Sequence, residues 1–159
     1  MLPAAVPVRI IRYQARYARD FKRLNLEWLR KYFRVEPIDE AVLSNPGKII
    51  KDGGCILLAR RGRQIVGTCA LLPAANDRFE LSKMAVTSDF QGAGIGRRLL
   101  TSAIAAFKAT GARELFLDTN SVLVSAVSLY ESLGFVHAPR PSQSPYQRTN
   151  VHMVYRQLD

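Results

Sequence analysis

Cysteine is scarce in this 159-residue chain, and long hydrophobic runs are absent. Cys55 and Cys69 are too few for a disulfide framework. Both lie in apolar stretches, where a buried free thiol is expected. Neither has a nearby partner in the sequence that would lower its pKa, so we do not expect a covalent intermediate on a cysteine.

No apolar run exceeds a few residues, which excludes a segment long enough to span a bilayer. The stretch 1–6 lacks a charged region followed by apolar residues, so we expect no signal peptide. We therefore expect a cytoplasmic protein without membrane contact. The length fits one domain with a single core, residues 1–159.

Metal ligands are scarce as well. Histidine occurs only at positions 137 and 152, and no cluster of Asp, Glu or Cys lies at ligand spacing. We therefore expect no metal site. Both histidines are expected to be structural, although His152, in a late strand, could face a substrate pocket.

Acidic residues are outnumbered, with 13 Asp and Glu against 23 Lys and Arg, which gives a net charge of +10. Such an excess favours anionic partners. The basic residues are spread along the chain, however, and form no dense tract interleaved with aromatic residues. Nucleic-acid binding is therefore not expected as the main function and is kept only as an alternative.

Glycine is concentrated in one place, the stretch Gln91-Gly92-Ala93-Gly94-Ile95-Gly96. It lies between a strand-like run, 79–86, and a helix-like run, 97–109. A glycine-rich turn that opens a helix presents backbone N–H groups and the helix dipole to an anion. Arg97 and Arg98 follow and add full positive charge. The stretch predicts a phosphate-bearing ligand, and the absence of Gly-Lys-Ser/Thr after it excludes a mononucleotide P-loop.

Hydrophobic periodicity predicts the secondary structure. Strands are expected at 8–13, 55–59, 64–72, 79–86 and 114–118, from 135 to 137, and around 151–155. Helices are expected at 14–33, 38–44, 97–109 and about 122–133, with turns at 45–47 and 73–77. The predicted face of the first helix holds Phe21, Leu24, Trp28 and Tyr32, and that of the last holds Val122, Ala126, Leu129, Tyr130 and Leu133. Asp118, Thr119 or Asn120 is the expected N-cap of that last helix. This order predicts an α/β (α+β) fold, a mixed sheet with helices on both faces.

Five segments together resemble the GNAT N-acetyltransferase superfamily. They are the glycine loop, the strand end Met84-Ala85-Val86-Thr87, the helix start 96–100, the strand 115–119 and the segment 126–135, which reads Ala-Val-Ser-Leu-Tyr-Glu-Ser-Leu-Gly-Phe. The resemblance is close over residues 79–137. It implies a mostly antiparallel sheet of six to seven strands flanked by about four helices.

The resemblance also implies acetyl-CoA as co-substrate, with the glycine loop around its pyrophosphate. Main-chain atoms at Met84 to Val86 would then bind the pantetheine arm and polarise the thioester carbonyl. The expected cofactor-binding residues are Met84, Ala85, Val86, Gln91, Gly92, Ala93, Gly94, Ile95, Gly96, Arg97, Arg98, Asn120 and Tyr130.

Two side chains match the family's catalytic positions. Tyr130 would protonate the leaving thiolate, and the alternative is an ordinary core tyrosine. Glu80, eleven residues before Gln91, would accept the amine proton, and the alternatives are a solvent-facing glutamate or one that only orients the amine. Leu123 stands where many members have an Asn that contacts the cofactor, so Asn120 either compensates or simply caps the helix.

The implied function is acetyl transfer from acetyl-CoA to a primary amine of a small molecule or peptide, directly within a ternary complex. The alternative is a non-catalytic acyl-CoA-binding sensor. Residues 14–45 and 139–150 are expected to border the acceptor pocket. The segment 144–148 could hold a substrate carboxylate or be a surface loop tied down by Tyr146. A homodimer is left open.

Overall fold

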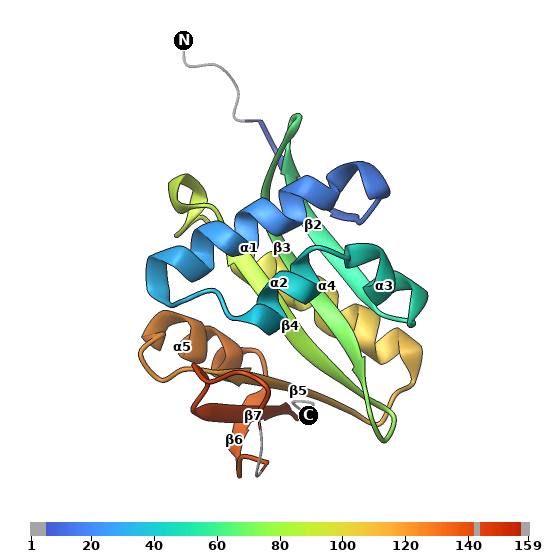
Figure 1. Cartoon of the computed structure of the whole chain (residues 1–159), viewed down its shortest axis with the longest axis vertical. Coiled ribbons are helices and arrows are strands. Elements are labelled where there is room, and N and C mark those ends of the chain that lie inside the picture. The colour runs from blue at the N-terminus through green and yellow to red at the C-terminus, as the bar shows by residue number, and fades with distance from the viewer. Residues whose placement is uncertain (1–5, 142–143, 157–159) are drawn as a thin grey trace.

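The computed structural model describes residues 6–141 and 144–156, and its centre is a single seven-stranded sheet (Figure 1). The order across the sheet is β1-β2-β3-β4-β5-β7-β6, and only the β4–β5 pair is parallel. The strands are β1 (Val8–Arg12), β2 (Cys55–Arg61), β3 (Gln64–Ala74), β4 (Arg78–Val86), β5 (Glu114–Thr119), β6 (Phe135–Ala138) and β7 (Val151–Tyr155). The predicted mixed and mostly antiparallel sheet is confirmed.

Helices cover both faces of this sheet. They are α1 (Ala18–Tyr32), α2 (Pro37–Leu43), α3 (Pro46–Lys51), α4 (Ile95–Thr110) and α5 (Val124–Ser132), with short 3₁₀ turns η1 (Ala15–Tyr17) and η2 (Ser88–Phe90). The first three pack on one face, and α4 crosses the other (Figure 1). The sheet therefore separates two apolar clusters, one under α1–α3 and one under α4 and α5.

The face of α1 differs in part from the predicted one. Phe21 and Leu24 are buried as expected, and Leu29 completes the buried face, whereas Tyr32 is 42% exposed. Trp28 packs on Phe33 with ring centroids 5.6 Å apart, in the last turn of the helix and just beyond it. The C-terminal end of α1 thus carries aromatic rings that are not sealed in the core.

A fifth helix replaces the turn predicted at 45–47. Pro46 begins α3 at its first position, where a proline loses no hydrogen bond and its fixed φ suits the helix. Ile49 is then buried on the face shared with Ile56. The predicted turn at Asn45-Pro46-Gly47 is therefore wrong, and this sequence starts a helix.

Two further boundaries differ from those predicted. β3 continues through Pro73, because β2 pairs with β3 only as far as Leu71 and the missing proline N–H therefore faces an unpaired edge.

α5 begins at Val124 with Leu123 as its N-cap residue. The predicted caps Asp118, Thr119 and Asn120 are wrong. Val122 precedes the helix and is 71% exposed, so it is not part of a buried face.

Candidate functional site

The sheet opens between β4 and β5. The parallel ladder joins only Arg78–Glu80 to Glu114–Phe116. Beyond it, residues 81–86 of β4 pair with β3 alone, and 117–119 of β5 pair with β7 alone. The two strands therefore diverge from Glu80 onward, and each leaves one backbone edge facing a gap.

A bulge in β4 accompanies this divergence. The register with β3 passes from Thr68↔Ala85 to Ala70↔Ser82, so Lys83 and Met84 lie opposite one residue of β3. Lys83 has φ +55°, in the left-handed region that non-glycine residues rarely adopt. A bulge bends and twists its strand, which carries the end of β4 away from β5.

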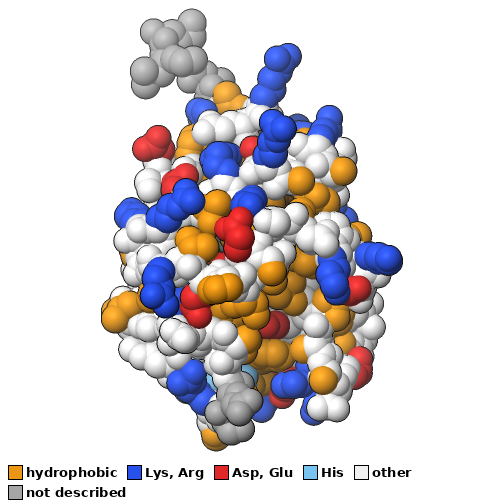
Figure 2. All heavy atoms as spheres, in the orientation of Figure 1, with side chains coloured by type: hydrophobic (Ala, Val, Ile, Leu, Met, Phe, Trp, Pro, Cys, Tyr) orange, Lys and Arg blue, Asp and Glu red, His pale blue; other side chains and the backbone are white. Residues whose placement is uncertain are grey.

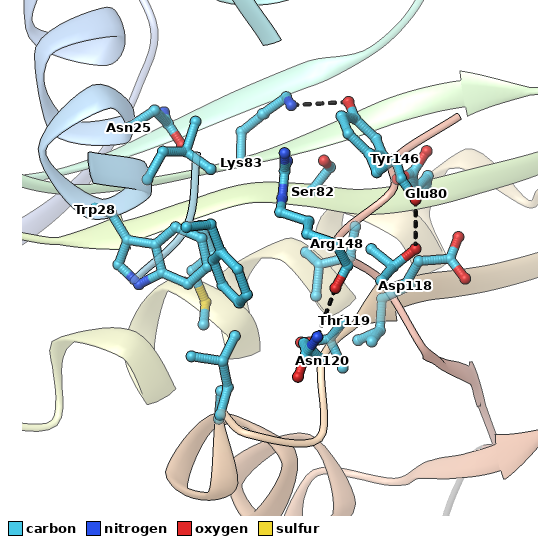
Figure 3. Close-up of a pocket in the computed structure, with 18 of the residues that line it drawn as sticks. Asn25, Trp28, Glu80, Ser82, Lys83, Asp118, Thr119, Asn120, Tyr146 and Arg148 are labelled. Carbon is cyan, nitrogen blue, oxygen red and sulfur yellow. Dashed lines mark hydrogen bonds between the residues drawn. The ribbon is translucent and has the colours of Figure 1, made fainter. Parts of the chain in front are cut away.

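A cavity of about 120 Å³ lies in the gap (Figure 3). β4 and β5 supply its polar side chains, the C-terminal part of α1 and the start of α5 supply apolar ones, and the segment 146–149 closes one end. Its walls include Trp28, Leu29, Phe33, Glu80, Ser82, Lys83, Met84, Asp118, Thr119, Asn120, Leu123, Tyr130, Tyr146 and Arg148.

Glu80 lies where the paired part of β4 ends, and it lines this cavity. The pKa of Glu80 is raised from 4.5 to about 7, chiefly by burial and secondly by the negative charge of Asp118. Lys83 and Arg148 oppose that shift. The carboxyl group therefore changes its ionisation near neutral pH, as a general base requires.

Tyr130 lines the same cavity from α5. Its ring packs edge-to-face on Phe135, with centroids 5.9 Å apart, and only 9% of the residue is exposed. Burial raises the pKa of the Tyr130 phenol, and Cys69 contributes to the shift. The phenol thus stays protonated at neutral pH, and no residue in the described part of the chain hydrogen-bonds to its hydroxyl.

The glycine loop lies just outside the cavity, between η2 and α4. Gly92 and Gly94 have φ values of 81° and 80°, and a Cβ at either position would meet nothing within 4 Å. Gly94 is the N-cap residue of α4 and offers no side chain to its first N–H groups. These donors are therefore left for an anion at the positive end of the helix dipole.

The other predicted cofactor residues divide into side-chain and backbone candidates. Ala85 and Ile95 are core residues, 2% and 3% exposed, so only their backbone could contact a ligand. The Gln91 amide donates to the Val86 carbonyl at 3.0 Å and holds the loop to the end of β4. Arg97 donates to the Ser132 hydroxyl at 3.0 Å, which ties α4 to α5.

Asn120 is not a helix cap. Its amide donates to the Arg148 carbonyl at 2.6 Å, and its side-chain oxygen accepts from the Val122 N–H at 2.9 Å. The residue thus shapes the turn before α5 and fastens the segment 146–149 to the end of β5. It still lines the cavity.

A buried ionic network closes the α2 side of the cavity. Arg148 donates three hydrogen bonds of 2.7–2.8 Å to the carboxylates of Glu36 and Asp39. Lys83 donates to Asp39 at 3.1 Å and to the Tyr146 hydroxyl at 2.8 Å. Of the two meanings considered for the segment 144–148, a loop tied down by buried Tyr146 is the one observed, because Arg148 is already occupied by carboxylates of α2.

The histidines have separate environments. His152 is buried in β7, and its Nδ1 lies 2.9 Å from Asp118 Oδ1. His137 lies 3.5 Å from Glu131 at the surface. No group of three or more His, Cys, Asp or Glu side chains within residues 6–141 and 144–156 could hold a metal.

Both cysteines are free thiols. Burial raises the pKa of Cys69, and it also raises that of Cys55 although Arg12 opposes the shift from 3.4 Å away. Arg12 is the charged partner of Cys55 that the local sequence did not reveal. Neither thiol is activated as a nucleophile.

Comparison with known proteins gives the family of this fold and site. Residues 52–137, more than half of the chain, match the family model described as an acetyltransferase (GNAT) domain. The chain belongs to the GNAT acetyltransferase family. The predicted resemblance is therefore confirmed.

Individual GNAT relatives agree. Human N-acetyltransferase 8B is 32% identical over 112 residues, which cover 65% of this chain and 49% of that protein. A GNAT acetyltransferase structure from Staphylococcus aureus Mu50 superposes with a TM-score of 0.85 at 25% identity, over 94% of this chain and 98% of that one. The chain spans about half the length of the curated relatives it matches.

A second structure, that of an acetyltransferase from Salmonella typhimurium with its cofactor acetyl-CoA, superposes with a TM-score of 0.74 at 18% identity. It covers 96% of this chain and 95% of that one. The similarity extends over nearly the whole chain, well beyond the segment matched by the family model. At 18% identity, this structural similarity is evidence for the fold alone.

The structure gathers some predicted site residues and adds others. Glu80, Met84, Asn120 and Tyr130 line one cavity. Trp28 and Phe33 fall within 14–45, which was expected to border the acceptor pocket, whereas Lys83 and Asp118 were not predicted as site residues. Asp118 could have been found from the sequence, because it follows the apolar run Leu115–Leu117 at the end of a predicted strand. The bulge at Lys83 has no sequence signature.

Two general features complete the description. Within residues 6–141 and 144–156, no helix is both long and apolar enough to cross a membrane. The Lys and Arg side chains are spread over the face in Figure 2 and do not gather into one patch there.

Proposed function

We propose that this GNAT domain transfers an acetyl group from acetyl-CoA to a primary amine. One observation carries the proposal: the gap between β4 and β5 begins at Glu80, a carboxyl group with a pKa raised to about 7, and ends beside a glycine loop with free helix N–H groups. The same opening therefore joins an anion site, an unpaired backbone edge and a proton acceptor.

The cofactor would occupy the gap from loop to cavity. Backbone N–H groups of residues 92–96 would hold the pyrophosphate, with Arg98 contributing charge. Main-chain atoms at Met84 to Val86 would bind the pantetheine arm, and an N–H at Met84 or Ala85 would stabilise the developing oxyanion. Side-chain contact from Asn120 is limited, because both ends of its amide already have partners.

Each proton in the reaction has a residue in the cavity. Glu80 would take a proton from the acceptor ammonium, directly or through water, so that the nitrogen lone pair can attack the thioester carbon. As the N–C bond forms and the C–S bond breaks, Tyr130 would give its proton to the departing thiolate, and the second proton lost by the acceptor nitrogen would restore the Tyr130 phenol through water. Because neither cysteine is activated, we propose direct transfer within a ternary complex.

The deciding experiment is release of free thiol from acetyl-CoA across a panel of amines, amino acids, polyamines and peptides, with wild type and Glu80→Gln. We expect turnover of at least one amine to rise with pH through about 7, as Glu80 deprotonates. Glu80→Gln should lower kcat/KM by about 100-fold and abolish that rise.

The control is the thermal shift produced by acetyl-CoA, which Glu80→Gln should leave unchanged. Stabilisation by acetyl-CoA with no turnover of any amine would instead identify a non-catalytic sensor. No stabilisation at saturating acetyl-CoA would count against the whole proposal.

Three points from the sequence stay open beside this proposal: the expected cytoplasmic location, the homodimer that was left open, and the expectation that nucleic acid is not a main partner. Cell fractionation, sedimentation and salt-dependent DNA or RNA binding would test them in turn.

A further inference from the structure

The charges that line the cavity are not balanced evenly. Lys83 and Arg148 are its two lining cations, and both are committed to the carboxylates of Glu36 and Asp39. These four groups neutralise one another, two positive against two negative. They leave Glu80 as a lining carboxyl group that forms no hydrogen bond or ion pair with a basic side chain of the described residues.

Asp118 is the second acid on this side of the cavity, and within the described residues neither a Lys nor an Arg pairs with it. Its side chain is 11% exposed, and the described side chain bonded to it is His152, at 2.9 Å. In the view of Figure 3, Glu80 and Asp118 lie on the same side of the pocket.

Apolar side chains also line the cavity, namely Trp28, Leu29, Phe33 and Met84. Figure 3 draws Trp28 across the pocket from Glu80 and Asp118, with the polar Asn25 on the same side as Trp28. The Asn25 amide donates to the Phe21 carbonyl of its own helix at 2.9 Å. Trp28 and Phe33 are only partly buried, so their rings have surface left to cover. Burying apolar area of a ligand against them is favourable, and an ammonium group is also attracted to ring faces.

We infer that the acceptor is a primary amine on an apolar or aromatic body, without a carboxylate beside the amine. The ammonium lies toward Glu80 and Asp118, and the body lies against Trp28 and Phe33. A free α-amino acid would bring its carboxylate toward these two acids, while the lining cations Lys83 and Arg148 are already bonded to Glu36 and Asp39. Like charges at this range repel, and a buried unpaired carboxylate is costly. The inference rests on the proposed function and narrows its acceptor.

Matched acceptors test it. We propose kcat/KM measurements with 2-phenylethylamine, L-phenylalanine, L-phenylalaninamide, n-propylamine and spermidine, compared at equal concentrations of free-base amine so that differences in basicity drop out. We expect kcat/KM for 2-phenylethylamine and for L-phenylalaninamide to be at least tenfold higher than kcat/KM for L-phenylalanine. Both values should also exceed those for n-propylamine and spermidine by about tenfold.

Two variants locate the cause. Trp28→Ala should lower kcat/KM for 2-phenylethylamine about tenfold and lower that for n-propylamine by a smaller factor, because the propyl chain covers less of the ring. Asp118→Asn should narrow the preference for 2-phenylethylamine over phenylalanine, because it removes one of the repelling charges. If the ratio of kcat/KM for 2-phenylethylamine to kcat/KM for phenylalanine is the same in wild type and Asp118→Asn, the electrostatic part of the inference is contradicted.

The failure of this inference is distinct from failure of the proposed function. Phenylalanine or spermidine turned over faster than 2-phenylethylamine would overturn the inference while leaving acetyl transfer intact. If no amine is turned over, thermal shifts of the CoA-bound protein still decide, because 2-phenylethylamine should stabilise it more than phenylalanine does. The reverse order of stabilisation would overturn the inference without any activity measurement.

Discussion

At the scale of single residues, Glu80 shows how position along a strand sets chemistry. It is the last residue of β4 paired with β5, so its backbone is fixed while its side chain faces the opening. The surrounding protein removes water from the carboxyl group, and Asp118 adds repulsion. The sequence offset from Gln91 predicted this residue, but its raised pKa depends on Asp118, which lies 38 positions away and was expected to cap a helix.

The raised pKa of Glu80 makes a prediction about stability. Because the folded pKa of about 7 exceeds the ordinary value of 4.5, the folded state binds more protons than the unfolded state between these values. Stability therefore falls as pH rises through this window. Glu80→Gln, which cannot ionise, should be more stable than wild type at pH 8 by about 1–3 kcal/mol. Denaturant unfolding at pH 8 and pH 5 measures this, and an advantage that fails to shrink at pH 5 would refute the ionisation argument.

Tyr130 gives a second prediction at this scale. Tyr130→Phe keeps the ring against Phe135 but removes the proton proposed for the thiolate. We expect kcat to fall about tenfold or more, with no change in the thermal shift produced by acetyl-CoA. Single-turnover thiol release measures the chemical step directly. A variant as fast as wild type would remove Tyr130 from the mechanism and leave it as a core tyrosine.

At the scale of elements, the glycine loop and its helix were predictable because their signals are local. Gly92 and Gly94 need left-handed backbone, and an amphipathic helix follows them directly. Two other features were not predictable in this way. Asn45-Pro46-Gly47 fits both a turn and a helix start, and the fold selects the helix by burying Ile49. The bulge at Lys83 arises from pairing with β3, which no local pattern encodes.

Three matched glycine variants separate ligand binding from backbone strain. Gly92→Ala, Gly94→Ala and Gly111→Ala each force alanine into left-handed φ where a Cβ meets nothing within 4 Å. Each should lose about 1 kcal/mol of stability. Only the first two should also weaken acetyl-CoA binding, because Gly111 ends α4 far along the helix from the loop. Isothermal titration with acetyl-CoA reports this. Equal affinity in all three variants would argue that the loop does not bind the cofactor.

At the scale of the whole molecule, the buried ionic network joins segments more than 100 residues apart. Glu36 and Asp39 on α2 hold Arg148 near the C-terminus, and Lys83 of β4 completes the link. The family resemblance predicted the sheet and its helices, and it predicted that 139–150 would border the acceptor pocket. It gave no account of what fixes that segment, since the partners of Arg148 are set by tertiary contacts alone.

The network predicts a large effect from one neutral substitution. Burial would raise the pKa of Asp39, but hydrogen bonds from Arg148 and the Glu36 backbone and the charge of Lys83 lower it overall. Asp39→Asn leaves two buried cations short of a partner and should cost about 3–5 kcal/mol. Thermal unfolding at pH 7 measures the loss, with Glu40→Gln as control. Glu40 lies on the same helix and pairs with Lys22 at the surface, so its variant should match wild type.

The pH dependence of that effect has a fixed sign. The pKa of Asp39 in the folded protein lies below its ordinary value of 3.8. The contribution of the Asp39 carboxylate to the free energy of unfolding is therefore fully present above pH 3.8 and is lost as pH falls through the folded pKa. The difference between wild type and Asp39→Asn should therefore shrink in acid. A difference that stays constant down to pH 2 would mean that the substitution acts through packing.

The short parallel ladder has a mechanical consequence. Residues 78–80 and 114–116 are the seam between two half-sheets, β1–β4 and β5–β7–β6. A ligand whose amide groups hydrogen-bond to the unpaired edges of β4 and β5 would take the place of a strand and connect the two half-sheets. Part of its binding free energy would then come from holding the two half-sheets together, so the cofactor would also raise the free energy of unfolding of the domain.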